Sequence, residues 1–151
     1  MNLEKVKHQA RDLRKQAPRS PHLTLGEYAI LARTLDKCRA TILAMNGEYH
    51  FDCPVDKSLF TFKGIQSDAF KTAVAEGASD QEMITWVNDH GSPRTTAEVK
   101  AWSHEVITDL PYNNVKTRDW FMSVCTPLSL DPQTTTLFNY LDVDDTASFK
   151  R

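Results

Sequence analysis

Apolar residues recur every three or four positions along most of the chain, which is the spacing of one buried helix face. The longest stripe consists of Leu31, Leu35, Cys38, Ile42 and Met45. Shorter stripes with the same period follow it, each bounded by residues that start or end helices. The pattern therefore predicts an all-α fold of six to eight helices in one compact domain.

The limits of these helices follow from capping residues. Three segments fit the capping box, in which a hydroxyl and a glutamate three residues later satisfy backbone N–H groups at a helix start. They are Thr24 to Glu27, Ser79 to Glu82 and Thr95 to Glu98, and Asp131-Pro132 offers a further start. We predict helices over residues 2–15, from Leu25 to Asn46 or Gly47, and over 55–61, 67–76, 80–89, 96–109, 117–125 and 133–141.

The segment around Asn46-Gly47 is compatible with two structures. Asn-Gly between β-prone runs is typical of a two-residue turn, so this segment can form a short β-hairpin. The apolar stripe nevertheless continues to Met45 at helical period, which favours a helix that ends at Asn46 or Gly47. We therefore expect a helix here, with the hairpin as the alternative.

The distribution of charge and proline divides the domain, residues 1–151, into a helical core and two charged ends. Basic side chains gather in the helix expected over residues 2–15. Pro-Arg-Ser-Pro makes 16–23 an extended linker, because residues before proline avoid the α region. The helical core covers 24–141, and three aspartates predict a solvated acidic tail over 142–151.

The overall composition argues against nucleic acid and membranes as partners. The 151 residues carry a net charge of −2, so only the basic N-terminal helix could make a weak contact to a polyanion. No run of about 18 apolar residues is present, and we expect no membrane span. Three scattered cysteines without Cys-x-x-Cys spacing, and an N-terminus without an apolar signal core, predict a reduced cytoplasmic protein without a metal or other cofactor.

Four charged residues fall inside the long predicted helix, which is otherwise apolar. Arg33, Asp36 and Arg39 are three residues apart, so Asp36 can pair with either arginine along the helix. Buried charges need partners, and we expect these three residues to form a structural ion-pair network with Glu48. This network would hold the linker and the segment 47–56 around the helix.

The fourth charge, Lys37, leads to a second hypothesis. It lies one turn after Arg33 on a helix face that also carries small residues. A guanidinium and an ammonium group on such a face can bind a carboxylate or a phosphate. We predict that Arg33, Lys37, Tyr49 and His50 line a pocket for a small anionic ligand.

Cys53 and His50 are the candidates for catalysis. Cys53 precedes Pro54 at an expected helix start, where the helix dipole and a nearby His50 or Lys57 would favour the thiolate. A cysteine that only packs and a histidine that only forms hydrogen bonds are the alternatives. His50-x-x-Cys53 could supply half of a metal site, but the other half is not visible, so we predict no metal.

Several of these residues also carry a resemblance to a known family. The chain contains Asp-Leu at 12–13, Pro-Arg-Ser-Pro at 18–21, Leu-Gly-Glu-Tyr at 25–28, Arg-Thr-Leu-Asp-Lys-Cys-Arg-Ala at 33–40, Gly-Glu-Tyr-His at 47–50 and Cys-Pro-Val-Asp at 53–56. Together with the closing segment TTTLFNYLDVDD, these motifs resemble the uncharacterised bacterial domain of unknown function 5069 family. The resemblance spans most of the chain, and it implies no activity, cofactor or catalytic residue.

The sequence is compatible with two functions. The chain has no Gly-rich phosphate loop, His-Glu-x-x-His or Gly-x-Ser-x-Gly motif, which removes several common enzyme classes. We therefore expect a helical binding or interaction module with an anion-binding pocket. The alternative is a small-molecule enzyme that uses a pocket around Arg33, Lys37, His50 and Cys53. The sequence assigns neither a ligand nor an oligomeric state.

Overall fold

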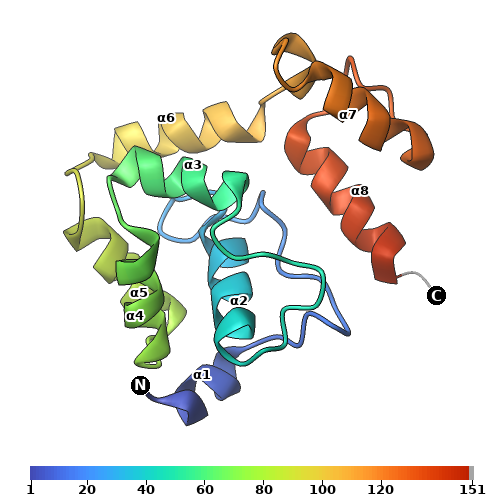
Figure 1. Cartoon of the computed structure of the whole chain (residues 1–151). Helices are drawn as coiled ribbons and strands as arrows, with labels where there is room; N and C mark the ends of the chain where they lie inside the picture. The colour runs from blue at the N-terminus through green and yellow to red at the C-terminus, as the bar shows by residue number, and fades with distance from the viewer. Residues whose placement is uncertain (150–151) are drawn as a thin grey trace.

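The long apolar stripe folds into α2 (Leu31–Ile42), which runs through the middle of the molecule (Figure 1). The computed structural model describes residues 1–149, which contain eight α-helices, two short 3₁₀ helices and no β-strand. The all-α prediction is therefore confirmed. The other elements are α1 (Leu3–Gln9), α3 (Pro54–Lys63), α4 (Ser67–Ala75), α5 (Asp80–Asp89), α6 (Thr96–Ile107), η1 (Pro111–Asn113), α7 (Arg118–Cys125), η2 (Thr126–Leu128) and α8 (Leu137–Phe149).

Helices flank α2 on two sides and form one compact domain with it. In Figure 1, α3 to α6 lie on one side, α7 and α8 on the other, and α1 near one end. The larger core cluster joins Leu31 and Leu35 of α2 to buried residues of α3 to α6, including Phe60 and Phe70. A smaller cluster around Phe138 joins α8 to the residues just before α2. Within residues 1–149, no helix has the length and apolar content that a membrane span requires.

The capping residues fix α5 and α6 as the sequence predicts. Ser79 and Thr95 each accept a hydrogen bond from the backbone N–H three residues later, and Glu82 and Glu98 accept one in return. Each capping box thereby satisfies backbone N–H groups that have no partner within the helix. At the other end of α3, Gly64 adopts the left-handed conformation of a C-cap.

The predicted start of the long helix at Leu25 is wrong, because α2 begins six residues later. Gly26 and Glu27 both have positive φ, and Leu25 and Tyr28 exchange two backbone hydrogen bonds across them, so these residues form a tight turn. A Cβ atom on Gly26 would lie 2.4 Å from Cγ2 of Ile84. This close approach to α5, together with the left-handed φ, requires glycine and excludes a helix here.

Neither of the two structures considered around Asn46-Gly47 is formed. The helix α2 ends at Ile42, and residues 43–53 form an irregular loop instead of a hairpin. The loop is held by a hydrogen bond from the Leu13 N–H to the Met45 carbonyl. Its side chains pack on different helices, since Phe51 contacts two phenylalanines of the core while Tyr49 faces α8. A hairpin would need one shared apolar face.

The two ends of the chain also differ from the prediction. The first helix stops at Gln9 instead of residue 15, and the acidic segment is not a solvated tail, because residues 142–149 belong to α8. Asp131 only initiates a turn, and Thr136 accepts a hydrogen bond from the Asn139 N–H at the start of α8. Residues 150–151 of the predicted tail lie outside the described residues.

Candidate functional site

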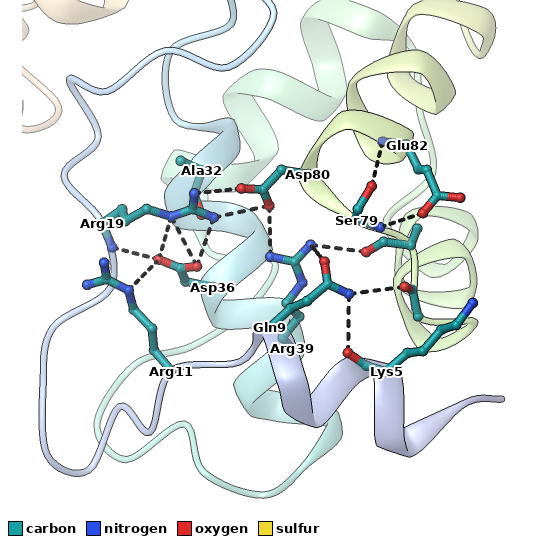
Figure 2. Close-up of polar contacts among 12 residues, drawn as sticks. Lys5, Gln9, Arg11, Arg19, Ala32, Asp36, Arg39, Ser79, Asp80 and Glu82 are labelled. Atoms are coloured by element: carbon teal, nitrogen blue, oxygen red, sulfur yellow. Dashed lines mark hydrogen bonds and ion pairs between the residues drawn. The ribbon is translucent and has the colours of Figure 1, made fainter.

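The charged residues of α2 pair with segments outside the helix and not with one another. Arg19 of the linker donates to both carboxylate oxygens of Asp36, with Nη2 to Oδ1 and Nε to Oδ2 distances of 3.0 Å (Figure 2). Arg39 instead contacts Asp80 of α5, at 2.9 Å from Nη1 to Oδ1. The expected pairing of Asp36 with Arg33 or Arg39 is thus replaced by a contact with Arg19 of the linker. The guanidinium group of Arg19 is a bidentate donor to the Asp36 carboxylate.

Asp80 joins the two arginines into one network at the start of α5. It accepts from Nη1 of Arg19 at 2.8 Å as well as from Arg39 (Figure 2). Burial acts to raise the pKa of this carboxyl, but the hydrogen bonds from Arg19 and Arg39 outweigh burial and lower the pKa below 3.8. Ionised Asp80 therefore stabilises the fold above pH 3.8, and this contribution is lost as the pH falls through the lowered pKa.

Arg33 of α2 forms an ion pair with the C-terminal helix, α8. Its Nη1 and Nη2 atoms lie 2.7 and 3.2 Å from the two carboxylate oxygens of Asp145 in α8. Tyr49 of the loop donates its hydroxyl to the same carboxylate at 2.8 Å, and burial together with this bond raises the pKa of Tyr49. Glu48, the partner expected from the sequence, is exposed and forms no ion pair within residues 1–149.

Lys37, one turn further along α2, connects Cys53 to a buried carboxylate. Its Nζ atom lies 3.0 Å from Cys53 Sγ and 3.0 Å from Asp56 Oδ1. The Asp56 side chain is fully buried, and it also accepts from the Thr34 hydroxyl at 2.6 Å and from the Asp52 N–H at 2.8 Å. The lysine and the thiol are therefore held in a fixed arrangement.

A cavity of about 840 Å³ lies between α2, α8, the loop 43–53 and the segment that follows α1. We refer to it as the α2–α8 pocket. It is lined by Leu13, Arg14, Arg33, Lys37, Gly47, Glu48, Tyr49, His50, Cys53, Val55, Leu141, Asp144, Ser148 and Phe149. The structure thus brings together all five residues that the sequence singles out for a ligand or catalytic site, from two separate segments, α2 and the loop 43–53.

Two carboxylates of this region were not foreseen from the sequence. The sequence predicts no role for Asp56, although this residue closes the Cys-Pro-Val-Asp motif one helical turn after Cys53. The sequence also predicts a solvated tail around Asp145, but the packing of α8 buries this residue. The neighbouring Asp144 lines the pocket, and burial and the charge of Asp145 raise its pKa.

The three cysteines lie in different environments. Cys38 and Cys125 are buried, and burial raises the pKa of Cys38 to about 12 and that of Cys125 in the same direction. Cys53 is half-buried and borders the α2–α8 pocket. It occupies the N-cap of α3, as predicted, with Pro54 in the first turn. No group of three or more His, Cys, Asp or Glu residues within 1–149 is arranged to hold a metal ion.

The fold and site define an all-helical protein with a pocket of mixed polar and apolar lining beside its central helix. The family model described as Domain of unknown function (DUF5069) matches residues 15–147, and the chain belongs to this family. The motifs around α2 and the loop pointed to the same family. A search of curated proteins found no match.

Proposed function

We propose that the protein binds a small organic anion in the α2–α8 pocket. The observation that carries this proposal is the convergence of Arg14, Arg33, Lys37 and His50 on one concave surface, which two carboxylates, Glu48 and Asp144, also line. Its volume of about 840 Å³ falls within the range of about 300–1,000 Å³ that is common for small-molecule sites. An interaction module without a ligand would not require such a cavity.

The ion pairs of the pocket indicate how the anion would be held. Arg33 and Lys37 each already pair with a carboxylate, so they form a nearly neutral floor. His50 is exposed at the rim, and among the described residues 1–149 Arg14 pairs with Asp12 at the surface and with no other carboxylate. The anionic group would therefore lie near His50 and Arg14, and its apolar part would lie against Leu141 and Phe149 of α8.

The proposal can be tested by calorimetric titration of the full chain with inorganic phosphate, succinate and citrate at low salt. His50→Ala removes an imidazole hydrogen-bond donor at the rim without disturbing a buried pair, and we expect it to weaken binding of the anion about tenfold. His104→Ala on α6 is the matched control, because His104 is also exposed and lies outside the pocket. It should bind like the unchanged protein.

Two results would contradict the proposal. One is an absence of saturable binding for all three anions, and the other is an equal effect of His50→Ala and His104→Ala. The alternative of a small-molecule enzyme depends on Cys53, which borders the same pocket.

A further inference from the structure

We propose that Cys53, Lys37 and Asp56 act together in the α2–α8 pocket as nucleophile, proton carrier and positioning residue for transfer of an acyl group. The proposal rests on the pocket of the proposed function but not on the charge of the ligand. Its substrates are activated acyl compounds, such as thioesters and reactive esters, small enough to enter this pocket.

The arrangement has the three parts that an activated nucleophile requires. A nucleophile must lie within hydrogen-bonding reach of a base, and a third group must orient the base. Here Lys37 Nζ lies 3.0 Å from Cys53 Sγ, and Asp56 holds the same nitrogen at 3.0 Å. Asp56 is itself fixed by Thr34 and by the Asp52 N–H, so Lys37 has little freedom to turn away.

Access distinguishes this cysteine from the other two. Cys53 borders the cavity, whereas Cys38 and Cys125 are buried away from it. The Lys37 side chain is only 4% exposed, so water competes little for its contact with sulfur. A substrate in the pocket can therefore reach the thiol, and Lys37, which also lines the pocket, contacts the same sulfur.

The start of α3 supplies hydrogen-bond donors next to the thiol. Cys53 is the N-cap residue, and its side chain accepts no hydrogen bond from the helix. Pro54 has no N–H, so the first N–H groups of the helix belong to Val55 and Asp56. Backbone N–H groups at a helix start stabilise negative charge on a carbonyl oxygen during attack. Val55 also lines the pocket.

The reaction balances without any further reagent. The proton shared between Cys53 and Lys37 resides on Lys37 while sulfur attacks the carbonyl carbon, a C–S bond forms, and the carbonyl oxygen takes the electron pair. The carbonyl then re-forms, the bond to the leaving group breaks, and Lys37 returns the proton to that group. Water or another nucleophile attacks the resulting thioester in the same way, which releases the acyl group and restores the thiol.

A direct test uses p-nitrophenyl acetate as the acyl donor with the full chain. We expect a burst of p-nitrophenol and an acetyl group on Cys53, located by peptide mass spectrometry. Cys53→Ala should abolish the burst. Cys125→Ala is the matched control, because Cys125 is buried on α7 and should leave the burst unchanged.

Lys37→Arg separates catalysis from a structural role. Arginine keeps the positive charge beside Asp56 but cannot release a proton to act as a base. We expect this variant to hydrolyse the acetyl group from Cys53 about 10²- to 10⁴-fold more slowly, because no base then takes the proton of the attacking water. Hydrolysis at the unchanged rate would show that Lys37 carries no proton in the reaction.

The unchanged protein also tests the proposal, whether or not the variants fold. Acetylation of Cys53 no faster than that of glutathione at the same pH would overturn it, as would acetylation of surface lysines alone. Binding of phosphate, succinate or citrate is measured separately. The anion proposal can thus stand when acyl transfer fails, and acyl transfer can stand when no anion binds.

Discussion

Asp36 shows at the scale of one residue how this protein places charge in its interior. Its side chain is 2% exposed, and it accepts hydrogen bonds from both the side chain and the backbone N–H of Arg19. Removing two charges from water is costly, and close multiple hydrogen bonds offset that cost. The pair therefore contributes little net stability by itself, but loss of one partner leaves the other charge unsatisfied.

Asp36→Ala should accordingly lower the free energy of unfolding by about 3–5 kcal/mol, the range for removing one member of a buried pair. Urea unfolding followed by circular dichroism measures this difference. Lys57→Ala is the control, because its pair with Asp52 is largely exposed, and we expect a change of at most about 1 kcal/mol. Similar losses for both variants would show that the Asp36 pair is no more important than a surface contact.

At the scale of single helices, the capping box starts a helix in some places and not in others. Ser79 and Thr95 complete their capping boxes at α5 and α6. Thr24 lies in a sequence with the same spacing, but it precedes a tight turn and is exposed. The same four-residue pattern therefore starts a helix in two places and not in the third.

Alanine substitutions at the three positions test this difference. Ser79→Ala and Thr95→Ala should each cost about 1 kcal/mol of stability, because each leaves backbone N–H groups without an acceptor. Thr24→Ala should shift the urea midpoint by no measurable amount. A loss at Thr24 as large as at Ser79 would mean that residues 24–30 form a capped helix in solution.

At the scale of the whole molecule, a few polar contacts attach α8 to α2, the linker and the loop 43–53. Asp145 meets Arg33 and Tyr49, and Asp142 meets His22 of the linker at 2.9 Å. The apolar contribution is the smaller cluster around Phe138. Because α8 forms one wall of the α2–α8 pocket, its attachment determines whether the pocket keeps its shape.

Asp145→Asn should loosen α8 selectively, because Arg33 then lacks its buried countercharge. A local loss of about 3 kcal/mol corresponds to roughly hundredfold faster amide hydrogen exchange in residues 137–149. Asp142→Asn is the matched control on the same helix. The Asp142 side chain is 39% exposed, so we expect a much smaller effect. Equal effects on α5 and α8 would indicate global destabilisation instead.

The sequence predicts those parts of the candidate site whose residues lie close together along the chain. Arg33 and Lys37 are one turn apart on α2, and Tyr49, His50 and Cys53 follow within one loop, so their convergence needed only one reversal of the chain. Asp145 could not be found in this way. It lies 112 residues from Arg33, and no local pattern marks an acidic residue near a chain end as buried.

By itself the sequence determined the helical class, the limits of α5, the start of α6 and, within one residue, the start of α3. These depend on periodicity and on contacts within four residues, which act locally. Only the tertiary structure decided the partners of the α2 charges, the turn at Gly26 and the burial of Asp145. Each depends on which segments meet across the core. A charge that is removed from water there needs a partner of opposite charge, and that partner can come from a segment far away in the sequence.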